Sequence, residues 1–176
     1  MIKFYHDNKE ATAYLSKADK TFPGISSVAK GKEIIIASGR YKEIFLVSKE
    51  LLNMFNRLKD KSRIITIGEL FGTVSDTFVP SFSSLSEYAK LSKKKVFVSQ
   101  KGEQTFLYGF NLEKKFVVSF DTSIKVDDHV VVCNEHDEVL GLGKVISDFE
   151  DSKSEQKVIK NILDLGLCLR HKKMSE

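Results

Sequence analysis

The chain has 176 residues, of which 41 % are hydrophobic and 30 % are charged, a composition typical of a globular protein in water. No apolar run approaches the roughly 20 residues that a membrane helix requires, so we expect no membrane partner. The opening residues, Met1 to His6, lack the apolar stretch of a secretory signal. We therefore expect an intracellular protein in which Cys133 and Cys168 are thiols, a disulfide being the less favoured alternative.

The net charge of +4 is mild, but charges of opposite sign are separated along the second half of the chain. Residues 91–176 contain 14 Lys and Arg and 14 Asp and Glu. Each basic run alone is typical of a solvated turn, whereas three runs close together would form a cationic face. These runs consist of Lys93, Lys94 and Lys95; Lys114 and Lys115; and Arg170, His171, Lys172 and Lys173.

The first part of the chain mixes helices with strands. Apolar residues at helical spacing predict a helix over 8–18, which Asp7 or Asn8 would cap. Ser48 is placed to cap a second, amphipathic helix that starts at about residue 49. β-Branched and apolar runs predict strands at 33–38, 43–47, 63–67 and 77–82. This order is typical of an α+β fold rather than a regular βαβ series.

Strands dominate the second part of the chain. Ser84 and Glu87 have the spacing of a capping box and predict a short helix over 83–91. Residues 148–157 are polar and predict a loop, and residues 161–170 are expected to form a short helix. The domain boundary is expected near residues 82–84, which gives domains 1–82 and 83–176. Strands at roughly ten-residue spacing favour a barrel or sandwich, and they are expected at 95–99, 106–108, 116–120, 129–133 and 139–146.

No familiar catalytic pattern stands out. The sequence lacks a P-loop, paired Cys or His at zinc spacing, and the GxSxG of a nucleophile elbow. The pair Gly141 and Gly143 lies in a strand-rich region and predicts a bulge or a close backbone approach rather than a dinucleotide loop. Asp127 and Asp128 are interpreted as turn residues. We therefore expect no catalytic residue, no metal and no cofactor.

One segment suits single-stranded nucleic acid. Tyr108, Gly109 and Phe110 lie between two basic runs, and aromatic side chains there could stack with bases while lysines neutralise phosphates. Phe106 and Tyr108 could instead belong to the core, and at least one of the two is expected to do so. Gly109 is suited to a positive φ angle at the turn.

Residues 84–146 resemble a PUA domain, an RNA-binding β-pseudobarrel. The resemblance is carried by the short helix, the lysine-rich strand at 95–98, the segment Phe106 to Gly109, and the ending Val139 to Gly143. PUA domains usually have a Gly-Asp pair before the strand that begins here at His129. This chain has Asp127 and Asp128 instead, so the local turn geometry is in question.

The whole chain is similar to the Nip-seven ribosome-biogenesis factors of archaeal type, which join an N-terminal α/β domain to a C-terminal PUA domain. The fold implied is a sandwich of mostly antiparallel sheet and helices followed by a PUA pseudobarrel. The order and spacing of four segments carry this similarity: 43–48, 67–73, 82–85 with 106–109, and 164–170.

The resemblance implies a monomeric, non-catalytic factor that binds U- or AU-rich pre-rRNA during large-subunit assembly. Ribosome-assembly factors or the exosome would be its partners, in the cytoplasm or, in a eukaryote, the nucleolus. Two alternatives remain: a PUA-containing subunit of an RNA-modifying enzyme, and a protein–protein adaptor between rRNA and assembly or exosome machinery. The candidate RNA-binding residues are Lys93, Lys94, Lys95, Lys114, Lys115, Tyr108, Arg170, Lys172 and Lys173.

Overall fold

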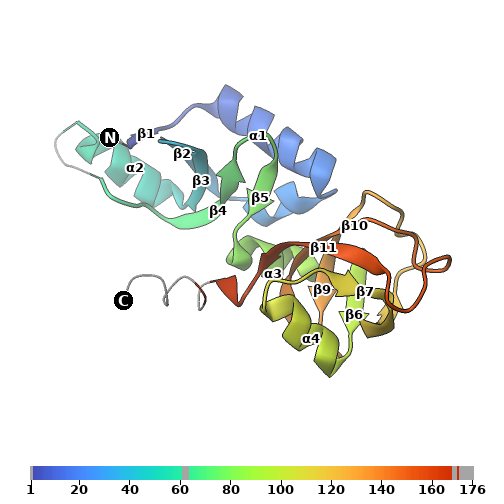
Figure 1. Ribbon diagram of the computed structural model, residues 1–176. Helices are drawn as coiled ribbons and strands as arrows, with labels where there is room; N and C mark the ends of the chain where they lie inside the picture. The colour runs from blue at the N-terminus through green and yellow to red at the C-terminus, as the bar shows by residue number, and fades with distance from the viewer. Residues whose placement is uncertain (1, 61–63, 168–169, 171–176) are drawn as a thin grey trace. The chain divides into compact units, whose positions relative to one another are not determined.

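A computed structural model describes residues 2–60, 64–167 and 170 of the chain (Figure 1). The chain divides into two compact units, residues 1–88 and 89–176. The boundary expected near residues 82–84 lies at the start of α3 (Phe82–Ala89), the helix in which the first unit ends. The α+β class expected from the sequence is confirmed, since each unit combines one sheet with helices.

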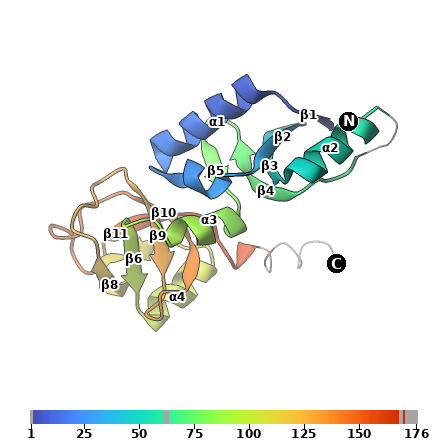
Figure 2. The same ribbon diagram turned by 180° about the vertical axis from the view of Figure 1, so that it is seen from behind.

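The first unit contains a five-stranded antiparallel sheet in which the strands follow one another in sequence order (Figures 1 and 2). The strands expected at 33–38 and 43–47 are confirmed, and a short strand lies within 77–82. The strand expected at 63–67 is wrong, because residues 64–67 form no regular structure and 63 lies outside the described residues. The strands are β1 (Lys3–Tyr5), β2 (Glu33–Ser38), β3 (Lys42–Val47), β4 (Glu69–Val74) and β5 (Phe78–Pro80).

Both helices expected in this unit form, with the caps that the sequence indicates. Asp7 accepts a hydrogen bond from the backbone N–H of Glu10 at the start of α1 (Asn8–Thr21), at 2.9 Å. Ser48 accepts one from Leu51 at the start of α2 (Lys49–Leu58), at 3.2 Å. Each cap satisfies one of the backbone donors that a helix leaves without a partner at its first turn.

Apolar side chains bury both faces of this sheet. Ile35 and Ala37 of β2 pack in one cluster with Phe55 of α2. Successive strand residues point to opposite faces, and the alternate residues Ile34 and Ile36 are also buried. The first unit therefore has enough core to position its helices without help from a ligand.

The second unit is built on a six-stranded sheet in the order β7-β11-β10-β9-β6-β8. β6 and β9 are parallel, and the other neighbouring strands are antiparallel. The strands expected at 95–99, 116–120, 129–133 and 139–146 are confirmed. Their bounds are β6 (Lys95–Val98), β7 (Leu112–Glu113), β8 (Val117–Phe120), β9 (His129–Cys133), β10 (Val139–Val145) and β11 (Lys157–Asp164).

Two expectations for local structure are wrong. Residues 106–108 are not a strand but the end of helix α4 (Gln100–Leu107), which Ser99 caps. Residues 161–164, where the C-terminal helix is expected to begin, belong to strand β11 (Lys157–Asp164). The short helix expected over 83–91 is confirmed as α3, but it begins at Phe82, and Ser81 in place of the expected Ser84 accepts the capping hydrogen bond, from the N–H of Ser84. Short 3-10 helices lie at η1 (Ile25–Ala29) and η2 (Lys114–Phe116).

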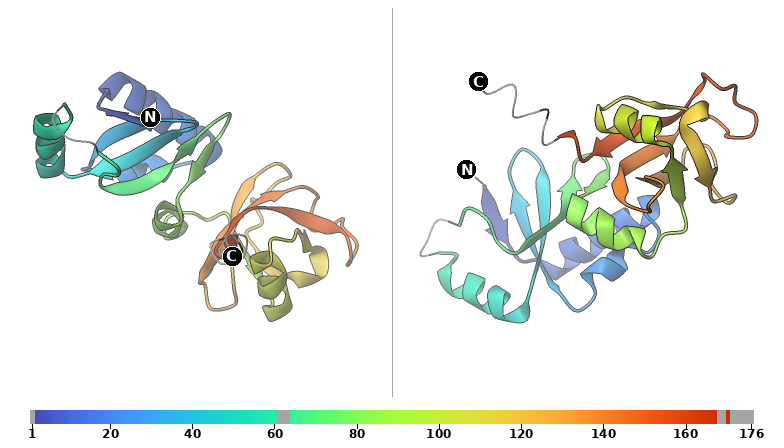
Figure 3. Two further views of the ribbon diagram at one scale, coloured as in Figure 1. Left: turned by 60° about the vertical axis from the view of Figure 1, so that its left-hand side comes forward. Right: turned by 90° about the horizontal axis from the view of Figure 1, so that it is seen from below.

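The core of the second unit lies between its sheet and α4. α4 contacts β6, β10 and β11 (Figure 3), and its Phe106 is fully buried with Val98 and Val132. Strand pairing slips in register next to Gly141 and Gly143, which confirms the bulges expected there. Cys133 is buried, and desolvation raises the pKa of its thiol to about 12. It is therefore a core residue, as the sequence indicates.

None of the helices described is long and apolar enough to cross a membrane. Within the described residues, no group of three His, Cys, Asp or Glu side chains is placed to hold a metal ion.

Candidate nucleic-acid interface

The end of α4 presents two exposed aromatic rings. Phe106 anchors the helix in the core, whereas Tyr108 and Phe110 are 69 % and 64 % exposed. Gly109, with φ of +87°, reverses the chain between the two rings. The sequence expectation that one of Phe106 and Tyr108 belongs to the core is thus confirmed, and Tyr108 is the residue available to a ligand.

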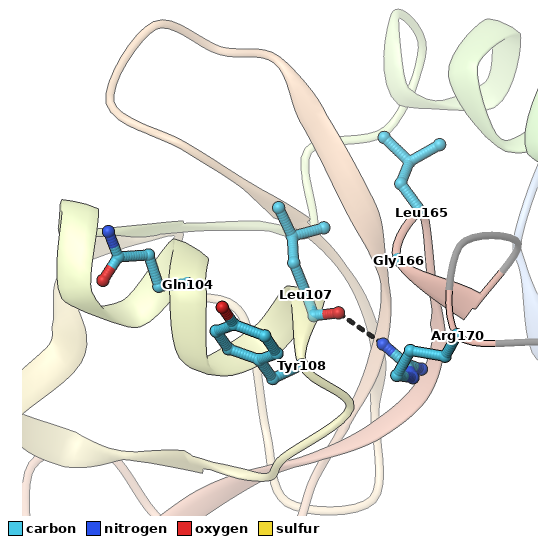
Figure 4. A pocket seen from close by; sticks show the side chains of 6 residues that line it. All are labelled: Gln104, Leu107, Tyr108, Leu165, Gly166 and Arg170. Carbon is cyan, nitrogen blue, oxygen red and sulfur yellow. Dashed lines mark hydrogen bonds between the residues drawn. The ribbon is translucent and has the colours of Figure 1, made fainter. Parts of the chain in front are cut away.

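A pocket of about 340 Å³ lies beside Tyr108 (Figure 4). It is formed by the end of α4 and by the segment that follows β11, both in the second unit. Its walls are mainly apolar, and the guanidinium of Arg170 supplies a positive charge. The lining residues are Gln104, Leu107, Tyr108, Leu165, Gly166 and Arg170.

Arg170 joins the two elements that form the pocket. Its Nη1 and Nη2 donate to Oδ1 and Oδ2 of Asp164, each at 2.8 Å. Nη1 also donates to the carbonyl oxygen of Leu107 at the end of α4 (Figure 4). The Asp164 carboxylate raises the pKa of Arg170, so the guanidinium is charged at any physiological pH.

Two glycines leave room for this guanidinium. A Cβ on Gly109 would lie 3.0 Å from Nη2 of Arg170. A Cβ on Gly166 would lie 2.0 Å from the Leu107 carbonyl oxygen and 2.9 Å from Nη1. Real Cβ atoms do not approach other atoms so closely, so a side chain at Gly166 would force α4 and the end of β11 apart.

Asn161 provides a second connection between α4 and β11. Its side-chain amide donates to the carbonyl oxygen of Phe106 at 2.8 Å, and its backbone N–H donates to Asn111 Oδ1 at 3.0 Å. The last turn of α4 is therefore held by both Asn161 and Arg170, which fixes the position of Tyr108.

The lysines predicted at the start of β6 already have acidic partners. Lys94 Nζ lies 2.6 Å from Asp128 Oδ1, and Lys95 Nζ lies 2.8 Å from Asp137 Oδ1. The hydrogen bond to Lys95 lowers the pKa of Asp137. Both pairs are partly exposed, and such pairs contribute little stability, so a phosphate could replace the carboxylates at modest cost.

Lys114 and Lys115 also have partners within the protein. Lys115 Nζ lies 2.6 Å from Glu113 Oε2, and this hydrogen bond raises the pKa of Lys115. Lys114 Nζ lies 5.2 Å from the centre of the Phe120 ring and 5.8 Å from that of Phe149. The Lys114 ammonium thus covers a stacked aromatic pair at the edge of the core.

The predicted site residues described by the structure fall into separate groups rather than one pocket. Tyr108 and Arg170 meet at the pocket, whereas Lys94 and Lys95 lie at β6, which β9 and β10 separate from β11. Lys93 is exposed and makes no ion pair with any described residue. Lys172 and Lys173 lie outside the described residues.

Sequence reasoning missed Gln104, Leu165 and Gly166 as pocket residues. Once 161–170 is interpreted as a helix, Leu165 is assigned to its apolar face, whereas the structure leaves it 46 % exposed after the end of β11. Gln104 is missed because Gly102, two residues before it, favours a turn over a helix in the sequence. The usable signal is Ser99, a favoured N-cap residue, followed by the acidic Glu103 in the first turn of α4.

The aspartate that stands in place of the expected glycine has a left-handed backbone conformation. Asp127 has φ of +74°, and its carboxylate lies 2.8 Å from Lys144 Nζ. The turn before β9 therefore uses a conformation that favours glycine, with an aspartate in it.

Comparisons with known proteins agree with this architecture. The model of the UPF0113 PUA domain family matches residues 94–173. A UPF0113 protein of Archaeoglobus fulgidus is 32 % identical over 145 residues, which cover 80 % of this chain and 79 % of that protein. The chain belongs to the UPF0113 family. Its second unit is a PUA domain, a type of domain that generally binds RNA, and the narrower Nip-seven resemblance stays a prediction.

Solved structures with this architecture match nearly the whole length of the chain. A conserved PUA domain protein from Thermoplasma acidophilum matches with a TM-score of 0.68 at 18 % identity, covering 94 % of this chain and 95 % of that one. A hypothetical protein from Pyrococcus horikoshii matches with a TM-score of 0.63 at 16 % identity, covering 93 % and 94 %. At these identities the likeness concerns the fold alone, and it includes both units.

Proposed function

We propose that this chain is an RNA-binding factor in pre-rRNA processing and large-subunit assembly that catalyses no reaction itself. It would bind U- or AU-rich single strands through its PUA domain. The observation that carries the proposal is the pocket at the end of α4, where exposed Tyr108 and charged Arg170 meet in a PUA domain.

The chemistry of the pocket suits an unstacked base. Base–aromatic stacking contributes roughly 1–3 kcal/mol per base and tolerates different bases. Tyr108 and Phe110 would each stack with a base, while the apolar wall formed by Leu107 and Leu165 excludes water. Phosphates further along the same strand would then be neutralised by the lysines at β6 and η2.

The non-catalytic role is supported by the burial or ion pairing of side chains that could otherwise act as a nucleophile, acid or base. Cys133 is buried, and its raised pKa opposes formation of a thiolate. Asp128 and Asp164 are engaged by Lys94 and Arg170. Methyl transfer or pseudouridine formation on rRNA by the purified chain would contradict this part of the proposal.

Titration of the full chain with fluorescent U-rich and C-rich single strands tests RNA binding. We expect Tyr108→Ala and Phe110→Ala each to weaken binding of the U-rich strand by roughly tenfold, from the loss of one stacked base. Tyr41→Ala, which removes an exposed tyrosine from the first unit, is the matched control and should leave the affinity unchanged. Equal affinities for all four proteins would contradict the placement of the site.

The biological role is tested in cells. Crosslinking of the chain to RNA, followed by sequencing of the bound fragments, should recover large-subunit pre-rRNA enriched in U or AU. Recovery of unrelated RNA without such enrichment would contradict a role in ribosome assembly.

One observation also favours the adaptor function. α2 leaves Met54 and Leu58 56 % and 41 % exposed, one helical turn apart, and Ile65 is 79 % exposed. These residues would let the first unit contact an assembly or exosome protein. Capture of such a protein should then be lost in M54K/L58K and retained in Tyr108→Ala.

A further inference from the structure

We infer that Arg170 is a positioning residue: with Asp164 it forms a latch that holds the end of α4 against β11 and so shapes the pocket, instead of contacting an RNA phosphate. This inference rests on the proposed RNA-binding function. It differs from the sequence-based expectation, in which Arg170 contributes its charge to an RNA-binding surface.

The bonding of the guanidinium favours the latch. Nη1 and Nη2 engage both oxygens of Asp164, and Nη1 also reaches the Leu107 carbonyl. An arginine has five N–H donors in a fixed planar fork, and three of them are used here. The edge formed by Nη1 and Nη2 is therefore already occupied by a carboxylate, which leaves only Nε and the second N–H of Nη2 for another acceptor.

The burial of Asp164 makes this pairing hard to exchange. The side chain of Asp164 is 4 % exposed, whereas those of Asp128 and Asp137, which pair with Lys94 and Lys95, are 25 % and 57 % exposed. Removing the partner of a buried charge is far more costly than removing that of an exposed one. A phosphate would thus displace Asp128 or Asp137 more readily than Asp164.

The latch lies where it determines the shape of the pocket. Leu107 and Tyr108 sit at the α4 end that Arg170 contacts, and Leu165 and Gly166 directly follow Asp164. Five of the six lining residues, Arg170 included, are thus at or beside the latched atoms (Figure 4). Opening the latch would shift Tyr108 away from Leu165 without removing any group that contacts RNA.

The test compares variants that separate charge from geometry in the full chain. Arg170→Lys keeps the positive charge but loses the fork. Asp164→Asn removes a negative charge and weakens the latch. Gly166→Ala changes no charge but places a Cβ where the Leu107 carbonyl and Nη1 of Arg170 lie. Lys153→Gln is the control, because it removes an exposed charge from a loop outside the pocket.

Affinity for a U-rich 12-nucleotide strand is measured over a series of salt concentrations. We expect Arg170→Lys, Asp164→Asn and Gly166→Ala each to weaken binding roughly tenfold while the slope of log K against log salt stays that of the unmodified chain. The double variant R170K/D164N should be no weaker than either single variant, because both open the same latch. Lys153→Gln should leave the affinity within about twofold of the unmodified chain.

A direct phosphate contact gives the opposite pattern. Asp164→Asn would then strengthen binding, because it frees the guanidinium and removes a repelling charge. That result overturns the inference while leaving the proposed function intact. Failure of the unmodified chain to bind RNA contradicts the proposed function and the inference with it.

A readout at the pocket distinguishes the latch from general loss of stability. The chain has no tryptophan, so Tyr108→Trp introduces a single fluorophore at the pocket. In that background, Gly166→Ala should shift the emission maximum under conditions where circular dichroism shows an intact fold. An unchanged emission together with unchanged RNA affinity in Gly166→Ala would overturn the inference.

Discussion

Asp127 adopts a backbone conformation for which glycine is better suited. Its φ of +74° lies in the left-handed region. Glycine adopts this region readily, and among L-residues chiefly asparagine and aspartate do so. Its N–H donates to the Val145 carbonyl at 2.9 Å, and the N–H of Val145 donates to Asp128. The turn is thus fixed by backbone bonds that any replacement must keep.

Two replacements at this position should have very different effects. We expect Asp127→Gly to change the free energy of unfolding by no more than about 0.5 kcal/mol, because relief of strain offsets the added freedom of the unfolded chain. Asp127→Val should destabilise by about 1–3 kcal/mol, since a β-branched residue is strained at this φ. Urea denaturation of both variants measures the difference, and equal stabilities would contradict the role of the backbone.

His129 gives the second unit a predicted dependence on pH. Desolvation and the charges of Lys144 and Lys94 lower its pKa, against the opposing effect of Asp128. The folded state thus binds fewer protons than the unfolded state, in which the pKa is about 6.5. The free energy of unfolding should therefore fall as the pH drops below about 6.5 towards the pKa of the folded state.

This dependence is measured as the difference in urea midpoint between about pH 7.5 and about pH 5.5. The difference should shrink in His129→Gln and remain in His136→Gln, a control in the exposed turn between β9 and β10. A loss of the same size in both variants would assign the effect to another group.

The connection between α4 and β11 illustrates stability at the scale of elements. Asn161 bridges Phe106 and Asn111 with one side chain and one backbone bond. Asn161→Ala should cost about 0.5–1.5 kcal/mol of stability, because the hydrogen bond from its side chain to the Phe106 carbonyl is lost while the N–H of Gly109 still donates to that oxygen. Asn56→Ala, at an exposed position on α2, should stay within about 0.5 kcal/mol. A similar result for the two variants would contradict the bridging role.

Elements stabilised by local signals could be predicted from the sequence, whereas those that tertiary packing imposes could not. α1 and α2 have caps and apolar faces, and β2, β3 and β9 are continuous apolar runs. α4 was missed because Gly102 suggests a turn. The structure needs a glycine inside this helix, since a Cβ there would lie 2.9 Å from side chains of Phe116 and Val98.

β11 was misinterpreted for a related reason. Ile162, Leu165 and Leu169 have the spacing of a helix face, which predicts a helix over 161–170. Residues 157–164 form a strand because this segment lies between β10 and β7, which provide backbone partners on both edges. The pocket depends on both α4 and β11, so its aromatic and basic residues could be named from the sequence but its shape could not.

At the scale of the whole molecule, RNA affinity should depend only moderately on salt. Lys94, Lys95 and Lys115 each face a carboxylate of the protein. Few lysines are therefore free to neutralise a phosphate and release its counterion from the RNA. For about three to four phosphates, log K should fall with log salt at a slope of roughly −2 to −3. A slope near zero would contradict phosphate neutralisation.

The contribution of each lysine to this slope depends on whether a carboxylate of the protein already pairs with it. Lys93→Gln should reduce it by about 0.7, the value for one phosphate on a single strand, and Lys153→Gln should not change it. Glutamate replacements of Lys94 and Lys95 are less informative, because the new carboxylates would face Asp128 and Asp137 and destabilise the fold.

The strand order also has a consequence for synthesis of the chain. In the first unit each strand pairs with the next one along the sequence, and such local contacts form quickly. In the second unit β11 must insert between β10 and β7, its partner from about 45 residues earlier. The first unit can thus fold while the second is still being translated. The pocket beside Tyr108, which needs Asp164, Gly166 and Arg170, forms only after β11 and the residues up to 170 have left the ribosome.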